Sequence, residues 1–198
     1  MTKFLFSMGS QFVDGKPLNP GLAGGRYLGA YWGHRWSHQW PFLWSFHSVH
    51  DSATELDWLV NSRAHPFNMV FTRFCGLVPM YVLGLAQPTA VTADLTPFIY
   101  MIFGNVWSFV IHANLNLRLG FLEKIIASPA FHHWHHINQH HRLINKNYAA
   151  IFPFYDMIFG SFFLPKTTWP KSYGLLPPDK GHPRMGGQPW LADAQPSS

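Results

Sequence analysis

Histidine is the residue type whose number and spacing could support chemistry in this sequence, with 13 histidines among 198 residues. Most of them fall into short clusters at helical spacing. Residues three or four apart on a helix share a face, so the side chains of one cluster can reach the same metal ion. A lone histidine near the end of an apolar stretch adds an ionisable group where such groups usually have a function. The candidate ligands are His34 and His38, then His47, His50 and Asp51, the lone His112, and finally His132, His135 and His136.

The number of candidate ligands indicates a site for two metal ions, because a single zinc ion takes about four protein ligands. Neutral imidazole binds iron, copper, zinc and nickel, so the residue types leave the metal open. The absence of a His-Glu-x-x-His motif argues against a zinc protease. The other histidines are not assigned as ligands: His133 points to a different face from its neighbours, His140 and His141 lie in a predicted loop, His182 lies in the tail, and His65 caps or orients a neighbouring group.

The composition indicates a protein that partly faces lipid. Charged residues make up 12% of the chain and aromatic residues 17%, whereas soluble domains carry about 25% charged residues. The net charge of +5 comes without a run of Lys and Arg, which gives nucleic-acid binding little support and suits anionic headgroups better. Cys75 is the only cysteine, so an intrachain disulfide framework and multi-cysteine metal sites are excluded. No signal peptide is visible at the start of the chain.

We expect an all-α fold that positions these histidines around a transmembrane hairpin. Two apolar stretches, about 67–86 and 97–115, have the length needed to cross a bilayer; a buried helix pair in a soluble core is the alternative. Lys and Arg flank the pair and are absent between its members, which favours cytoplasmic flanks. The hairpin would then return the chain to the side that it left, so the early and late histidine clusters can meet.

The remaining segments are predicted from their composition. Residues 1–25 are expected to form an N-terminal loop region, 26–48 a helix broken near Pro41, and 49–66 a polar helix or turn. Residues 148–164 are apolar and aromatic and are expected to form a helix that packs against the site or lies in the membrane interface. Residues 166–198 are expected to be a tail rich in Pro and Gly.

The pattern resembles the membrane-bound fatty acid hydroxylase/sterol desaturase superfamily, whose signature is H-x3-H, H-x2-H-H and a later [H/Q]-x2-H-H. The matching motifs run from about Tyr31 to Phe163 and include His34-Arg-Trp-Ser-His38, His47-Ser-Val-His50 and His132 to His136. We therefore expect residues 26–165 to form a domain of this type. The resemblance implies a helical integral membrane protein, multi-pass, with a histidine-rich di-iron cap on its cytoplasmic side. It implies that the iron ligands include the paired and clustered histidines His34, His38, His47, His50, His132, His135 and His136, with His112 as a further ligand or a close partner.

Two features depart from the family pattern. Asp51 stands where the signature has its third histidine, and because a carboxylate can also bind non-haem iron, we retain it as a candidate ligand. Family members usually carry membrane spans before the first histidine pair, whereas here only about thirty residues precede it. A fragmentary or catalytically impaired family member is therefore an alternative expectation.

The activity implied by the resemblance is hydroxylation or desaturation of a lipid of the sterol, fatty acyl or alkylglycerol type, using O2 and two non-haem irons. Glu55, Asp57 and Asn114 are predicted to orient imidazoles by accepting their second N–H. The sequence has no dinucleotide fingerprint, cysteine cluster or haem signature, so an external electron donor such as a cytochrome b5-like protein, a ferredoxin or a reductase is expected. A non-redox zinc-binding membrane protein is the alternative from another class.

Overall fold

The computed structural model describes residues 12–13, 16–17, 20–83, 96–138 and 143–175. The fold is mostly helical, as predicted. Its longer helices are α2 (Pro20–Gln39), α3 (Pro41–Asp51), α4 (Pro66–Val82) and α5 (Thr96–His112). The shorter elements are the 3-10 helices η1 (Trp58–Ser62) and η2 (Gly120–Lys124), α6 (Pro129–His133), α7 (Phe154–Ile158), and an antiparallel pair of two-residue strands, β1 (Phe12–Val13) and β2 (Lys16–Pro17).

Prolines set the boundaries of the first helices. Trp40 has extended backbone angles and Pro41 occupies the first turn of α3, a position where the missing N–H of proline has no consequence. This confirms the predicted break near Pro41. The predicted N-terminal loop region is wrong for residues 20–25, because α2 already begins at Pro20 and runs through Gly24 and Gly25. Packing of α2 against α4 offsets the low helix propensity of these glycines.

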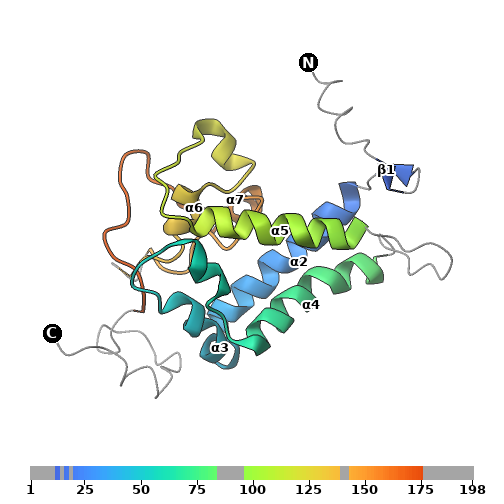
Figure 1. Cartoon of the computed structure of the whole chain (residues 1–198), viewed down its shortest axis with the longest axis horizontal. Helices are drawn as coiled ribbons and strands as arrows, with labels where there is room; N and C mark the ends of the chain where they lie inside the picture. The colour runs from blue at the N-terminus through green and yellow to red at the C-terminus, as the bar shows by residue number, and fades with distance from the viewer. Residues whose placement is uncertain (1–11, 14–15, 18–19, 84–95, 139–142, 176–198) are drawn as a thin grey trace.

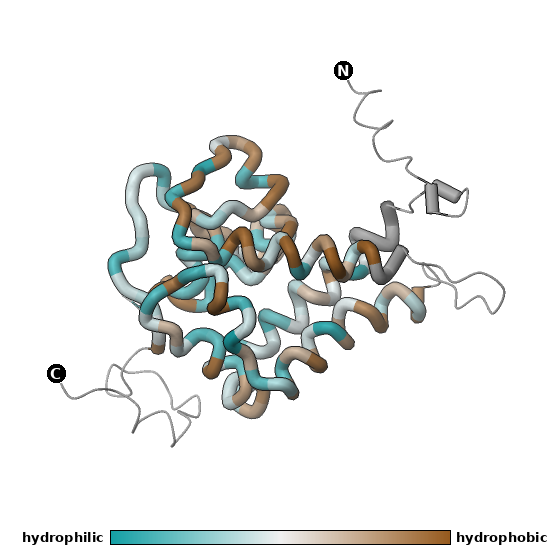
Figure 2. The backbone as a smooth tube through the Cα atoms, in the orientation of Figure 1, coloured by the Kyte–Doolittle hydropathy of each residue, from teal (hydrophilic) through white to brown (hydrophobic). Residues whose placement is uncertain are grey.

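The two apolar stretches form α4 and α5, each 17 residues long. Among the described residues, no helix combines the length and the apolar character that crossing a membrane requires. Figure 2 shows that α5 is largely apolar along its length. Large apolar side chains are exposed on both helices, among them Val70, Phe74 and Val82 on α4 and Ile102, Phe103 and Val106 on α5.

The helices α2 and α4 pack at very close range (Figure 1). Gly29 and Gly33 of α2 face Cys75 of α4, and a Cβ atom at Gly29 would lie only 2.0 Å from the carbonyl oxygen of Cys75. The C-terminal end of α5 lies next to η1 and α6. This arrangement brings the ends of α2, α3 and α5 and the turn after α6 to one region of the molecule.

The segment 148–164 is mostly irregular, so the predicted helix is wrong outside Phe154–Ile158. Asp156 is the reason: its carboxylate accepts hydrogen bonds from the backbone N–H groups of Tyr148 and Ala149 and from the Ser161 hydroxyl. Side-chain bonds of this kind compete with helix formation. The segment does pack against α2, as expected, because Tyr148, Ile151 and Tyr155 share a core cluster with Tyr27 and Tyr31.

Candidate metal centre

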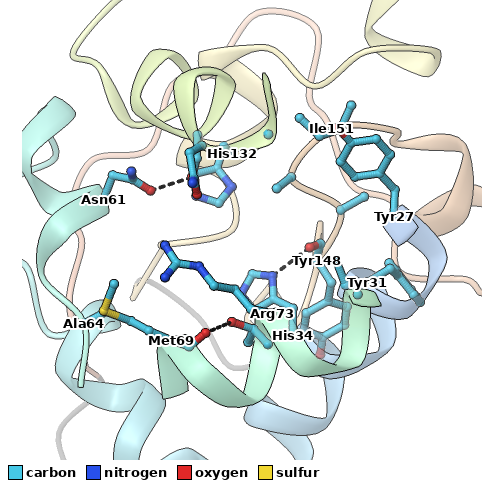
Figure 3. Close-up of a pocket in the computed structure, with 18 of the residues that line it drawn as sticks. Tyr27, Tyr31, His34, Asn61, Ala64, Met69, Arg73, His132, Tyr148 and Ile151 are labelled. Carbon is cyan, nitrogen blue, oxygen red and sulfur yellow. Dashed lines mark hydrogen bonds between the residues drawn. The ribbon is translucent and has the colours of Figure 1, made fainter. Parts of the chain in front are cut away.

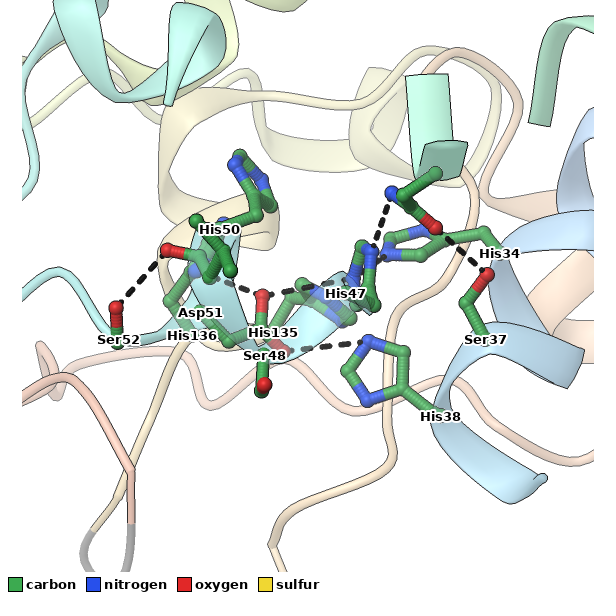
Figure 4. Close-up of polar contacts among 12 residues, drawn as sticks. His34, Ser37, His38, His47, Ser48, His50, Asp51, Ser52, His135 and His136 are labelled. Atoms are coloured by element: carbon green, nitrogen blue, oxygen red, sulfur yellow. Dashed lines mark hydrogen bonds and ion pairs between the residues drawn. The ribbon is translucent and has the colours of Figure 1, made fainter. Parts of the chain in front are cut away.

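Four imidazoles from three parts of the chain converge on one point, and we call them tetrad A. His34 and His38 come from α2, His47 from α3, and His135 from the turn that follows α6. Their candidate ligand atoms all lie within 4.8 Å of one another. The Nε2 atoms of His34 and His47 are 3.1 Å apart. The four rings therefore point their ring nitrogens at a shared centre, as Figure 4 shows for several of them.

A second group of four imidazoles, tetrad B, lies beside the first. His50 comes from α3, His112 from the last residue of α5, His132 from α6 and His136 from the turn after it. The Nε2 atom of His112 is 3.1 Å from that of His50 and 3.0 Å from that of His132. The Nε2 atoms of His132 and His136 are 3.2 Å apart. All four residues are buried.

The clusters in the sequence are not the clusters in space, although the helical spacing would let each sequence cluster reach one metal. His34 and His38 do share a tetrad. His47 and His50, however, belong to different tetrads, and so do His135 and its neighbours His132 and His136. Three residues along a helix advance by about 4.5 Å, so one short helix can present one imidazole to each of two adjacent centres.

The geometry and burial of the tetrads fit bound metal ions. Nitrogens that bind one ion at about 2.1 Å lie about 3.0–3.4 Å apart in octahedral or tetrahedral arrangements, which matches the measured separations of 3.0–3.2 Å. The Nε2 atoms of His38 and His135 are buried without a hydrogen-bond partner, and a metal ion would satisfy both. Burial lowers the pKa of His34 and of His50 to about 4, so these rings are in the neutral form that binds metals.

Asp51 lies close to rings of both tetrads, and Figure 4 shows it among several of these rings. Its Oδ2 atom is 3.4 Å from His38 Nε2, and its Oδ1 atom is 3.5 Å both from His47 Nε2 and from His136 Nδ1. Burial raises the pKa of this carboxyl. Asp51 thus faces Nε2 atoms of two rings in tetrad A and the Nδ1 atom of one ring in tetrad B. A metal cation would compensate its negative charge in this buried position.

Backbone carbonyls orient most of the other rings. The Nδ1 atom of His34 lies 2.7 Å from the carbonyl oxygen of Tyr148. The Nδ1 atom of His135 lies 2.7 Å from the carbonyl oxygen of Lys146. The corresponding partners are the carbonyls of Arg63 for His50, at 3.1 Å, and of Ser108 for His112, at 2.6 Å. A carbonyl can only accept, so it fixes the proton on Nδ1 and leaves Nε2 free for a metal.

The structure does not place the predicted orienting side chains beside the imidazoles. Glu55 and Asn114 are exposed, and Asp57 caps η1 by accepting from the N–H groups of Leu59 and Val60. His65 caps α4 by accepting from the N–H of Phe67, which is the capping alternative that the sequence offered. Backbone carbonyls orient these imidazoles instead. Every residue has a backbone carbonyl, so the sequence does not indicate which ones contact the rings.

Asn68 is a partner that sequence reasoning missed. Its side-chain amide lies 2.9 Å from His47 Nδ1, and the hydroxyl of Ser37 donates to its oxygen at 3.2 Å. The only signal in the sequence was an amide residue near the start of an apolar stretch, and the structure shows that this residue is buried. His133 lies outside both tetrads, as expected, because its ring nitrogens contact the Tyr173 hydroxyl and the Ala113 carbonyl. His140, His141 and His182 lie outside the described residues.

A cavity of about 420 Å³ opens onto the tetrads (Figure 3). Its walls include imidazoles of both groups, His34 and His47 from tetrad A and His50, His112 and His132 from tetrad B. The rest of the lining is largely aromatic and apolar, with Tyr27, Phe109, Ile151 and Phe152 among the residues. A small organic substrate in this cavity would meet both candidate metal positions.

Known proteins share this segment of sequence. Residues 22–161 match the fatty acid hydroxylase family. The chain is 31% identical over 127 residues to the ornithine lipid hydroxylase OlsE of Rhizobium tropici, a match that covers 61% of this chain and 34% of that protein. It is 31% identical to the alkylglycerol monooxygenase of Homo sapiens and 33% identical to that of Danio rerio, each over 116 residues, 59% of this chain and 24% of the relative.

The chain spans about a third or less of the length of these curated relatives. No solved structure matches it. The family match runs from α2 to the residues just beyond α7 and contains both tetrads and Asp51. The chain therefore belongs to the fatty acid hydroxylase family, within the fatty acid hydroxylase/sterol desaturase superfamily.

Proposed function

We propose that this chain is the catalytic part of a membrane-bound non-haem di-iron oxidoreductase that uses O2 to hydroxylate or desaturate a lipid. The observation that carries the proposal is the pair of imidazole tetrads beside a cavity whose lining is mostly, though not entirely, apolar. The names of the relatives, a lipid hydroxylase and an alkylglycerol monooxygenase, support a lipid as the substrate.

The proposed ligands divide into two sets. One iron would be held by tetrad A together with Asp51, and the other by tetrad B. When bound, two non-haem irons supply the redox chemistry that activates O2 for attack on an unactivated C–H bond. The metal-binding groups of the chain contribute neutral nitrogens and one carboxylate, and the carbonyl partners of the rings keep the protons on the far side from the metal.

The other residues of the site would bind the substrate and exclude water. The aromatic and aliphatic lining of the cavity suits an alkyl chain and keeps polar solvent from the reacting atoms. The chain supplies no group of its own that delivers electrons, because the sequence has no dinucleotide fingerprint, cysteine cluster or haem signature. An external electron donor completes the proposed reaction.

The proposal places the chain at a membrane. The exposed apolar side chains of α4 and α5 form surface that a lipid bilayer or detergent would cover. The Lys and Arg residues that flank these two segments favour a cytoplasmic metal site.

Iron content of detergent-purified protein, reconstituted anaerobically with ferrous iron, tests the proposal. We expect about two irons per wild-type chain and about one for His135→Gln, because loss of one imidazole weakens a single site. His133→Gln is the matched control: it removes a buried neighbouring histidine that lies outside both tetrads, and it should retain two irons. Oxygen consumption with a reductant is then measured with ornithine lipids, alkylglycerols and fatty acids.

Two results would contradict the proposal. One is wild-type protein that binds no iron. The other is protein that retains zinc and hydrolyses lipids without oxygen, which would establish the zinc-binding alternative. If the chain binds two irons but oxidises none of these lipids, the proposed substrate class is wrong and the proposed metal site is not.

A further inference from the structure

Arg26 is a buried cation in the wall of the cavity. It lies on α2, only 8% of its surface is exposed, and its Nε and Nη1 atoms have no hydrogen-bond partner. Burial lowers its pKa, the neighbouring Tyr27 hydroxyl offsets part of that effect, and the charge of Arg73 adds a smaller lowering. A buried guanidinium with unmet donors costs free energy unless an anion or acceptor satisfies it.

Arg73 adds a second positive charge to the same cavity. It extends from α4, and Figure 3 shows its side chain pointing into the cavity. Within the described part of the chain, every ion pair involves Asp51, so neither Arg26 nor Arg73 has a carboxylate partner there. Two guanidinium groups therefore face one cavity, and no carboxylate of the described residues pairs with either of them.

The helices that carry Arg26 and Arg73 fix the distance between these two side chains and the tetrads. Arg26 and His34 are eight residues apart on α2 (26 to 34), which is about 12 Å along a helix axis. Arg73 is five residues from Asn68 on α4 (68 to 73), the residue that contacts His47, which is about 7.5 Å. The two arginines therefore lie on the order of 10 Å from the candidate metals along the helix axes.

We propose that Arg26 and Arg73 bind the carboxylate or phosphate group of an anionic amphiphile, the headgroup of the lipid substrate, within the cavity that opens onto the tetrads. Guanidinium groups match both anions with paired N–H donors. An anion held there would place the C–H bonds on the order of 10 Å away next to the metals. The role of the bound lipid as substrate rests on the proposed function, whereas the binding of the anion does not.

The test compares ligands that share an alkyl chain and differ in headgroup charge. The full chain in a non-ionic detergent, without added iron, is titrated calorimetrically with dodecanoate, dodecyl phosphate, dodecanol and inorganic phosphate. We expect the wild type to bind dodecanoate and dodecyl phosphate at least about tenfold more tightly than dodecanol. Arg26→Gln and Arg73→Gln should each remove most of this preference and leave the dodecanol affinity unchanged.

Lys124→Gln is the matched control, because it removes one positive charge from an exposed position on η2, away from the cavity. It should bind all four ligands like the wild type. If circular dichroism shows that Arg26→Gln does not fold, Arg73→Gln decides the result, since Arg73 is exposed rather than packed in the core.

Equal wild-type affinity for dodecanoate and dodecanol would overturn the proposal, as would an anion preference that survives in both arginine variants. Inorganic phosphate binding as tightly as dodecyl phosphate would identify free phosphate as the ligand and overturn the assignment to a lipid headgroup. The iron content of the same preparations separates the two hypotheses. If the protein binds two irons but shows no preference for anionic headgroups, only the headgroup inference is wrong. If it prefers anionic headgroups but binds no iron when iron is added, only the di-iron function is wrong.

Discussion

At the scale of single residues, Asp51 has the most consequential position in the site. It provides a carboxylate among eight imidazoles, and it contacts rings of both tetrads. A carboxylate adds a negative charge that imidazole lacks, so it would favour a more highly charged metal. Its Oδ1 atom also lies 3.5 Å from the Nδ1 atom of His136, a ring of tetrad B. A change at this residue should therefore affect tetrad A directly and tetrad B through His136.

Asp51→Asn keeps the shape of the side chain and removes its charge. We expect the affinity of one iron to fall by about tenfold to a hundredfold, the range for loss of a group that supports a metal ligand, while the second iron changes less. Competition with a chelator under anaerobic conditions measures both affinities. Asp57→Asn is the control, because Asp57 caps η1 away from the tetrads and asparagine caps equally well. Wild-type affinity for both irons in Asp51→Asn would show that the carboxylate does not bind metal.

At the scale of elements, the close contact between α2 and α4 fixes the position of tetrad A. His34 and His38 lie on α2, and Asn68, which contacts His47, lies on α4. Glycines at the crossing allow this approach, since a Cβ at Gly29 would lie 2.0 Å from the backbone of Cys75 and one at Gly33 would lie 2.7 Å from the Cβ of Cys75. Widening of this crossing would separate α2 from Asn68 on α4, which contacts both Ser37 of α2 and His47.

Gly29→Ala should therefore destabilise the protein, although alanine favours a helix. The backbone of α4 would have to move, and overpacking of this kind costs about 1–3 kcal/mol. Gly24→Ala is the matched control on the same helix: its Cβ would have only the Tyr155 hydroxyl nearby, at 3.9 Å, and the gain in helix propensity is up to about 1 kcal/mol. Thermal unfolding of the two variants in detergent gives the comparison. Equal unfolding temperatures would mean that the crossing adjusts freely.

The loop before α7 is the other element that shapes the site. Asn145 and Asn147 adopt left-handed backbone angles, with φ of 61° and 58°, a conformation that asparagine tolerates better than most residues. The Asn147 side chain bonds the backbone of Phe131 and Phe163. These contacts, together with Asp156, hold the carbonyls of Lys146 and Tyr148 against His135 and His34.

At the scale of the whole molecule, the proposed metals would join separate parts of the chain. Tetrad A draws on α2, α3 and the turn after α6, and tetrad B on α3, α5, α6 and the same turn. Without metal, the buried nitrogens of His38 and His135 lack partners, and this reduces the stability of the folded state. Metal binding and folding are therefore expected to be strongly coupled.

Removal of metal should lower the unfolding temperature of the entire domain rather than loosen one loop. Ferrous iron at about 100 times its dissociation constant would stabilise the folded state by about 2.7 kcal/mol for each site. Circular dichroism melts of chelator-treated and iron-loaded protein, recorded anaerobically, measure this difference. The iron-dependent shift should shrink in His135→Gln and persist in His133→Gln. An unfolding temperature that does not depend on iron would contradict the structural role of the metals.

The amino-acid sequence by itself determined which residues are candidate metal ligands and where the longer helices lie. Histidines at helical spacing identified His34, His38 and the later clusters as candidate ligands, and Pro41 located the break between α2 and α3. These features are local, because the spacing along a helix and the backbone restriction of proline depend only on neighbouring residues.

The tertiary structure decided which histidines lie together and what surrounds them. It assigned His47 and His50 to different tetrads, placed Asp51 close to rings of both, and supplied backbone carbonyls and Asn68 where Glu55, Asp57 and Asn114 were expected. It also replaced a predicted helix at 148–164 with a loop held by Asp156. These outcomes depend on contacts between residues distant in the chain, and a carbonyl group is the same at every position, so no local pattern encodes them.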